Sequence, residues 1–177
     1  RDLVRSRGLG DVYKRQVPYY TVDTEIYQII FEARKESNPC SLCAKMRKGA
    51  FNEKALELGC NKFAYAHHRD DLIETFYMSL MYEGRIHTFS PVTYMDKSGL
   101  TLIRPLMLIP EYAIKSFSKR YELPIVKNQC PADGYTKRQY IKDMLHNLSK
   151  ENPGLTEHSF TAIINANLED WPKRIVR

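Results

Sequence analysis

Residues 66–75 (AHHRDDLIET) concentrate side chains that could do chemistry. Two histidines, His67 and His68, and two adjacent carboxylates, Asp70 and Asp71, directly follow a short apolar run. Adjacent carboxylates at a helix N-terminus are favoured as caps, by about 0.3–1 kcal/mol each. The same pair can instead hold Mg²⁺ or a ribose hydroxyl, while a neighbouring imidazole donates to a phosphate. The residues alone leave capping and nucleotide binding as equal alternatives.

Three cysteines form a second candidate site. Cys40 and Cys43 stand in a C-x-x-C spacing, and Cys130 lies far downstream. A lone C-x-x-C is compatible with zinc, a redox pair or an iron–sulfur cluster. Three thiolates suit a cluster with one open iron position, whereas a Cys₃His zinc site needs a histidine as fourth ligand. The candidates for that ligand are His67, His68 and His146.

Two further residues are interpreted individually. Arg104, which begins Arg-Pro-Leu after an apolar run, can neutralise a phosphate at a strand end, although an ion-paired or surface arginine is equally common. Cys60 follows Gly59 ahead of another apolar run, and we interpret it as a buried small hydrophobe.

The elements that must position these residues alternate between strand and helix patterns. Strands are predicted over 17–22, 62–66, 91–95, 100–103 and 123–126, helices over 41–58, 70–82, 110–121 and 136–148, and a short helix or ordered loop over 24–35. Turn residues at 96–99 allow the two strands around them to pair as a hairpin. The alternation predicts an α/β fold with a largely parallel sheet, in which ligands bind at the carboxyl ends of strands. The residues after Ala66 and Ile103 are therefore the first candidates.

One predicted helix, residues 70–82, carries a stripe expected to face the core and ends before Gly84. The stripe consists of Leu72, Ile73, Phe76, Leu80 and Met81. Residues 152–177 are partly amphipathic, and a C-terminal helix packed on the domain and a contact with a partner subunit remain open alternatives.

Composition favours a single folded domain and gives no indication of a membrane-spanning or secreted protein. The chain has 177 residues, of which 43% are hydrophobic, which suits one folded core. No stretch approaches the roughly 20 apolar residues that cross a bilayer, and no signal peptide is visible, so the default compartment is the cytoplasm and membranes are not expected partners. The chain carries a net charge of +6. Part of its positive charge forms a basic cluster on both sides of the first cysteine pair: Arg34, Lys35, Lys45, Arg47 and Lys48. Such a cluster suits an anionic partner.

Taken together, these motifs resemble one family closely: the ATP pyrophosphatase-type (PP-loop) tRNA 2-thiocytidine synthetases, with the tRNA lysidine synthetases as their relatives. The resemblance runs from about Tyr19 to about Asn152, in order and at family-like spacing. Its parts are Cys40-x-x-Cys43 before Met46-Arg47-Lys48-Gly49, Ala66-His67-His68-Arg69-Asp70-Asp71-x-x-Glu74-Thr75, Arg104-Pro105-Leu106, and Cys130 ahead of Arg138. The combination is specific, whereas no single part is.

The resemblance implies a Rossmann-like fold of the adenine nucleotide alpha hydrolase type and a two-step reaction. A cytidine of the tRNA anticodon loop is adenylated at its C2 oxygen, and sulfur then replaces that oxygen. By carry-over, Cys40, Cys43 and Cys130 hold a [4Fe-4S] cluster and take part in catalysis. The nucleotide side comprises Ala66, His67, His68, Asp70, Asp71 and Arg104, with Asp70 and Asp71 also able to bind Mg²⁺. The implied partners are tRNA and a sulfur donor such as a cysteine desulfurase, and a homodimer is left open.

The resemblance also implies what the chain lacks. The family has a glycine-rich S-G-G-x-D-S phosphate loop after its first strand, and no such run occurs here. We therefore expect a chain truncated at its N-terminus: a non-native, adapter-like leader over 1–16, a PP-loop domain without its first strand and phosphate loop over 17–152, and a C-terminal helical extension over 153–177. Such a chain is expected to bind ATP poorly and to lack thiolation activity.

Three alternatives stay open. Lysidine-type ligation shares the His-His-x-Asp-Asp segment but does not need Cys40, Cys43 and Cys130 together. A zinc module that binds RNA without catalysis would need no phosphate loop, although the carboxylates beside two histidines argue against it. A C-x-x-C oxidoreductase is disfavoured by the basic residues after Cys43. Tyr135 and Tyr140 are interpreted as either base-stacking residues or ordinary helix-face packing.

Overall fold

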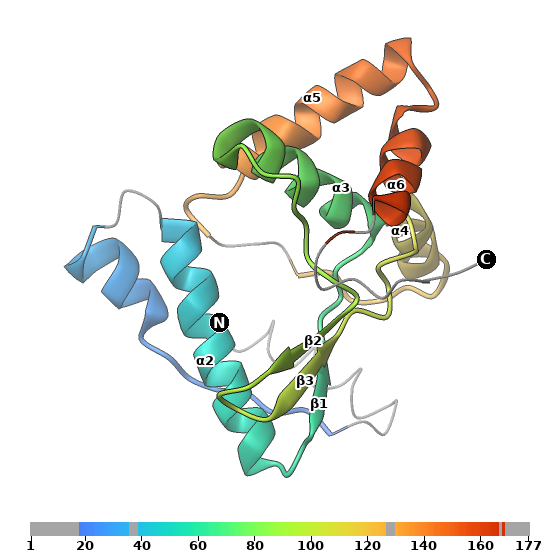
Figure 1. The fold of residues 1–177 in the computed structure, drawn as a ribbon. Coiled ribbons are helices and arrows are strands. Elements are labelled where there is room, and N and C mark those ends of the chain that lie inside the picture. The colour runs from blue at the N-terminus through green and yellow to red at the C-terminus, as the bar shows by residue number, and fades with distance from the viewer. Residues whose placement is uncertain (1–17, 36–38, 127–129, 167, 169–177) are drawn as a thin grey trace. The chain divides into compact units, whose positions relative to one another are not determined.

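The structure, a computed structural model, describes residues 18–35, 39–126, 130–166 and 168 (Figure 1). The chain divides into two compact units, and both are discontinuous in sequence. The first consists of the described parts of Arg1–Gly59 and Lys115–Asp133, and the second of those of Cys60–Ile114 and Gly134–Arg177. The three candidate cluster cysteines belong to the first unit, whereas the segment from Ala66 to Arg104 belongs to the second. The predicted leader over 1–16 lies outside the described residues.

A small mixed sheet lies in the second unit. Its strands β1 (Lys62–Ala64), β2 (Val92–Met95) and β3 (Leu100–Ile103) follow the order β1-β3-β2. β1 runs parallel to β3, with Phe63 opposite Leu102, and β2 runs antiparallel to it. The predicted hairpin is therefore confirmed. Gly99 closes its turn at φ +68°, a left-handed conformation that favours glycine.

The prediction of a largely parallel sheet is wrong for the described residues, because one strand pair is parallel and the other antiparallel. Residues 18–22 and 123–126, expected as strands, are irregular, and residue 17 lies outside the described part. Their aromatic and β-branched side chains are exposed: Tyr19, Tyr20, Val22, Ile125 and Val126. With no buried face in these segments, strand propensity alone does not offset the entropy cost of ordering them.

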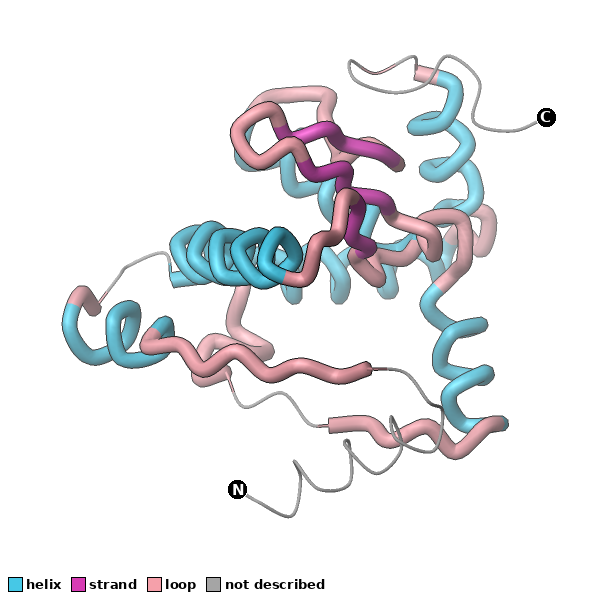
Figure 2. The backbone as a smooth tube through the Cα atoms, turned by 90° about the horizontal axis from the view of Figure 1, so that it is seen from below, coloured by secondary structure: helices cyan, strands magenta, loops and turns pink. Residues whose placement is uncertain are grey.

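Helices account for most of the described chain (Figure 2). They are η1 (Gln28–Ala33, a π-helix), α2 (Pro39–Glu57), α3 (Arg69–Met78), η2 (Ser79–Glu83, a π-helix), α4 (Glu111–Arg120), α5 (Lys137–Glu151) and α6 (Leu155–Asn165). The four predicted helices are confirmed with shifted ends. No helix in the described part of the chain is long and apolar enough to cross a membrane.

The core of the second unit lies where α3, α5 and α6 pack together (Figure 1). Leu72, Ile73 and Ile163 are buried there with Met107. The C-terminal region thus supplies a helix, α6, that packs on α3 within this unit.

The predicted core stripe of residues 70–82 is confirmed for Leu72, Ile73 and Phe76, which packs against the core, and is wrong for its last two residues. Leu72 and Ile73 are buried, but Leu80 and Met81 are 44% and 47% exposed. From Ser79 the chain continues as the π-helix η2, whose wider turn rotates later side chains away from the α-helical stripe. Gly84 ends the element in a left-handed conformation, as predicted.

Candidate functional site

His67 and Arg104 meet where β1 and β3 end. The Nε of Arg104 donates to Nδ1 of His67 at 3.3 Å. The Nη1 of Arg104 donates to Thr93 Oγ1 at 3.2 Å and to the carbonyl oxygen of Ser90. The imidazole of His67 stacks on the ring of Phe89 at 4.8 Å, and the guanidinium of Arg104 lies 4.9 Å from the same ring. The carboxyl ends of the parallel strands, where ligands bind in such sheets, therefore carry the guanidinium of Arg104 in a fixed position.

The environment of His67 favours the neutral form of its imidazole. Burial lowers the pKa of His67, the nearby charge of Asp71 opposes this shift, and the charges of Arg104, Arg138 and His68 add to it. Because Nδ1 accepts from Arg104, the proton of the neutral ring lies on Nε2. A neutral N–H donor beside a fixed guanidinium is an arrangement that binds a phosphate oxygen.

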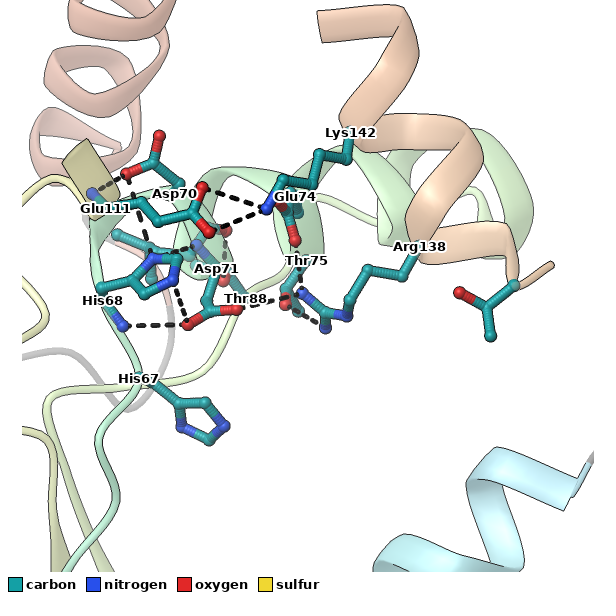
Figure 3. Close-up of polar contacts among 12 residues, drawn as sticks. His67, His68, Asp70, Asp71, Glu74, Thr75, Thr88, Glu111, Arg138 and Lys142 are labelled. Carbon is teal, nitrogen blue, oxygen red and sulfur yellow. Dashed lines mark hydrogen bonds and ion pairs between the residues drawn. The ribbon is translucent and has the colours of Figure 1, made fainter. Parts of the chain in front are cut away.

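His68 and Asp71 cap α3 reciprocally (Figure 3). The backbone N–H of Asp71 donates to His68 Nδ1 at 3.2 Å, and the backbone N–H of His68 donates to Asp71 Oδ2 at 3.0 Å. This capping box satisfies two amide groups at the helix start. For Asp71 the capping interpretation is therefore confirmed, whereas the N-cap itself is His68, which the sequence did not indicate.

Asp70 caps a different helix from the one on which it lies. Its Oδ2 accepts from the backbone N–H of Glu111, at the first residue of α4, at 2.6 Å. Both oxygens of Glu111 then accept from Lys142 Nζ on α5, at 2.9 and 3.0 Å (Figure 3). Burial works against the charge of Lys142, yet the hydrogen bond and charge of Glu111 outweigh it and raise the pKa of Lys142.

These contacts bear on the expected Mg²⁺ site. Asp70 and Asp71 both accept backbone hydrogen bonds, and no three His, Cys, Asp or Glu side chains within the described ranges are close enough to hold a metal ion. Mg²⁺ prefers near-octahedral oxygen ligands. The donor pair in this arrangement does not fit Mg²⁺, and we derive no step through it.

Arg138 is a residue of this site to which the sequence motifs assigned no role. Its Nη1 lies 3.0 Å from Glu74 Oε2, and its Nη2 donates to Thr75 Oγ1 at 3.0 Å. The side chain of Glu74 is 5% exposed. Burial raises the pKa of Glu74, whereas the hydrogen bond and charge of Arg138 lower it. A sequence signal did exist: Lys137 and Arg138 open α5, where the helix dipole disfavours cations.

A pocket of about 260 Å³ lies among the same helices. Its lining includes Asp70, Glu74, Glu111, Lys142, His146 and Thr156. The charges of Asp70, Glu74, Glu111 and Lys142 are already engaged in hydrogen bonds to protein groups. These four side chains therefore already have protein partners within the pocket, as Arg104 does at the strand ends.

The cysteines lie in the first compact unit, with the exception of Cys60. Cys40 and Cys43, three residues apart near the start of α2, share one face of that helix. Cys40 and Cys130 are exposed, Cys43 is half-buried, and all four cysteines are thiols rather than disulfides. The structure does not bring Cys40, Cys43 and Cys130 together as a metal-binding group. The prediction of a buried Cys60 is wrong: it is exposed, in the connection between α2 and β1.

Other predicted RNA-contacting residues are at the surface. Tyr135 and Tyr140 are 92% and 58% exposed, so ordinary helix-face packing is not their role here. The basic cluster flanking the first cysteine pair is exposed as well. Ala66 is also exposed, just ahead of His67.

Comparison with known proteins gives concordant results. The family described as the PP-loop domain matches residues 15–149. The tRNA-cytidine(32) 2-sulfurtransferase of Stutzerimonas stutzeri is 35% identical over 151 residues, which are 84% of this chain and 55% of that protein. The protein of the same name from Alcanivorax borkumensis is 36% identical over 154 residues, 86% of this chain and 54% of its own length. The chain thus spans about half the length of these relatives.

A solved structure shows the same fold. The U34-tRNA thiolase NcsA from Methanococcus maripaludis, with its [4Fe-4S] cluster, has a TM-score of 0.70 and 22% sequence identity. The match covers 93% of this chain and 58% of that one.

Proposed function

The chain belongs to the PP-loop domain family, and from this premise we propose that it is part of an enzyme that thiolates a cytidine in the anticodon loop of tRNA at the expense of ATP. One observation carries the proposal beyond the family match. His67 and Arg104 are hydrogen-bonded just beyond the ends of the adjacent parallel strands β1 and β3, where we assign them to phosphate binding, and the chain also carries Cys40, Cys43 and Cys130. The relatives at about 35% identity bear the name of this activity.

The proposed reaction has two steps. The C2 oxygen of the cytidine attacks the α-phosphorus of ATP, so that an O–P bond forms and pyrophosphate leaves. Sulfur at the oxidation level of sulfide, which a persulfide donor supplies only together with a two-electron reductant, then bonds to C2, the C2–O bond breaks, and AMP leaves with the oxygen. In the first step, the guanidinium of Arg104 and Nε2–H of His67 bind phosphate oxygens, where negative charge has to be stabilised.

In this proposal His68, Asp70 and Asp71 do not contact the nucleotide; they hold the backbone around it in place. The cap between His68 and Asp71 fixes the backbone directly after His67, and Asp70 fixes the start of α4. Mg²⁺ enters only as the counter-ion of the ATP phosphates. An exposed basic surface around the first cysteine pair suits the tRNA backbone, because phosphate contacts supply much of the affinity for nucleic acids.

Cys40, Cys43 and Cys130 are the proposed cluster ligands. They are thiols of one compact unit that the structure does not hold as a preformed metal-binding group, so the family resemblance alone assigns them this role. Three protein thiolates leave one iron of a [4Fe-4S] cluster open, and such a cluster would supply sulfur-carrying chemistry at that iron. The proposed partner that provides the sulfur is a donor such as a cysteine desulfurase.

The nucleotide side is tested by titrating the chain with AMP while recording the imidazole NMR signals of its histidines. We expect weak binding, in the millimolar range that needs about −4 kcal/mol, with the largest shift at His67. His158, an exposed histidine on α6, is the internal control. If AMP shifts no signal of His67 at saturating concentration, a non-catalytic zinc and RNA module explains the chain better.

A further inference from the structure

Arg138 connects α5 to the second half of the 66–75 segment. Its Nη1 contacts Glu74 Oε2 at 3.0 Å, its Nη2 donates to Thr75 Oγ1 at 3.0 Å, and Asp71 Oδ1 lies 3.7 Å from Nη1. Three side chains of α3 therefore converge on one guanidinium, as Figure 3 shows. The planar fork of arginine can satisfy several acceptors at once, which an ammonium group cannot do in the same geometry.

The contact with Asp71 gives Arg138 a route to the nucleotide side. One oxygen of Asp71, Oδ1, faces the guanidinium, while the other, Oδ2, accepts the backbone N–H of His68. Arg138 therefore helps to orient the carboxylate of Asp71. That carboxylate in turn holds the backbone N–H of His68. His67 directly precedes His68 and accepts a hydrogen bond from Arg104.

A second cation on α5 makes a separate contact. Lys142, one turn after Arg138, binds Glu111 on α4 and so attaches the same helix to another element. It forms no hydrogen bond with Asp71, Glu74 or Thr75 among the described residues. Lys142 therefore acts on Glu74 and Asp71 only through its charge, whereas Arg138 contacts the side chains of α3 directly.

We propose that Arg138 is a positioning residue of the nucleotide side: it orients Asp71 and, through the cap with His68, fixes the backbone that presents His67 to a phosphate. This inference rests on the proposed function for its last step, whereas the effect on the cap stands independently. Arg138 itself is not assigned a contact with the ligand.

The test has to separate positioning from simple stabilisation. Arg138→Gln alone would leave Glu74 as a buried carboxylate without its cation, and such a variant can fail to fold. The double variant Glu74→Gln/Arg138→Gln replaces the ion pair with two neutral amides that can bond to each other. It removes the unpaired charge but does not restore a guanidinium beside Asp71. Lys142→Gln is the matched control, because it removes the other cation of α5.

Two readouts are taken on the full chain: backbone amide exchange at His68 and Asp71, and the AMP-induced shift of His67. In the double variant we expect a melting temperature near that of wild type, exchange at His68 at least tenfold faster, and AMP affinity reduced about tenfold. Lys142→Gln is expected to change neither the exchange nor the affinity.

Wild-type exchange at His68 in a folded double variant would overturn the proposal. Faster exchange with unchanged AMP affinity would overturn its last step. A wild-type chain that gives no AMP response contradicts the proposed function instead, and the exchange at His68 then still decides whether Arg138 orients the cap.

Discussion

Replacing Arg104 with alanine is expected to abolish the response of His67 to AMP and to destabilise the fold by about 2 kcal/mol. The guanidinium donates to His67, to Thr93 and to the carbonyl of Ser90. Hydrogen bonds from charged donors contribute about 1.5–3 kcal/mol, and acceptors left unpaired add a desolvation cost. The fixed positive charge at the strand ends, which the account assigns to phosphate binding, is lost at the same time. Chemical denaturation and the AMP titration measure the two effects separately.

Two matched variants are informative. One keeps the positive charge at position 104 but changes its geometry, and the other changes the cap of α3 and leaves Arg104 intact. Arg104→Lys keeps a positive charge but offers one nitrogen in place of a fork, so weaker AMP binding by about tenfold, or 1.4 kcal/mol, is expected. His68→Asn keeps a capping side chain, since asparagine is a favoured N-cap residue, and should bind AMP like wild type. An Arg104→Ala protein whose His67 still responds to AMP as in wild type would contradict the assignment of this edge.

Replacing Arg138 with alanine is expected to give the largest loss of stability, about 2–4 kcal/mol near pH 8. Removing one partner of a buried ion pair typically costs about 3–5 kcal/mol, and the loss here is smaller because water reaches the guanidinium. The side chain of Arg138 is 42% exposed, whereas that of Glu74 is only 5% exposed. The cost therefore falls on a carboxylate that is left without its cation.

The loss in Arg138→Ala should depend on pH in a defined direction. The folded-state pKa of Glu74 is already raised by burial, and it rises further once the hydrogen bond and charge of Arg138 are gone. At a pH above that raised pKa, Glu74 is charged in the folded variant, and the free energy of unfolding is lowered by the full cost of burying that charge. As the pH falls toward the unfolded-state value of about 4.5, Glu74 protonates in the folded state first, and the difference from wild type shrinks. Urea unfolding from pH 8 to pH 5 measures the trend. A difference from wild type that does not vary with pH would mean that Glu74 is not the group responsible.

His67 contributes to the pH dependence of stability with the opposite sign. Its folded-state pKa lies below 6.5 because burial favours the neutral ring. The unfolded chain then binds the proton first, so the contribution of His67 is present above pH 6.5 and is lost as the pH falls below it. Any comparison of Arg138 variants at low pH has to use the wild type at the same pH as its reference.

Local sequence patterns predicted the helices and the hairpin. The stripe containing Leu72 and Ile73 and the turn before Gly99 each depend on a few neighbouring residues, and both occur in the structure. That residues after Ala66 and Ile103 lie at one edge could also be predicted, because both follow predicted strands of a parallel pair, and His67 and Arg104 do meet there. Residue type predicted a strand at 123–126 and a buried Cys60, and both predictions are wrong because these residues lie at the surface.

The partners of individual polar side chains could not be predicted, since they come from distant parts of the chain. Asp70 was assigned to a cap of its own helix or to a ligand, and it instead holds the first residue of α4. Arg69 contacts Glu157 on α6 at 2.8 Å, another pairing that no local pattern reveals. In this segment, His67 contacts Arg104 at the strand ends, whereas several of its neighbours each attach α3 to another element.

The most direct test of the central claim is anaerobic purification of the chain with iron, sulfide and zinc analyses and a visible spectrum, alongside Cys130→Ser. If Cys40, Cys43 and Cys130 hold a [4Fe-4S] cluster, the wild type shows a broad iron–sulfur absorption with near-stoichiometric iron, and Cys130→Ser loses both. Cys60→Ser, which changes a cysteine outside the proposed ligand set, should keep the cluster. Zinc alone, or no metal in any of the three proteins, would contradict the thiolation account and favour lysidine-type chemistry or a structural module.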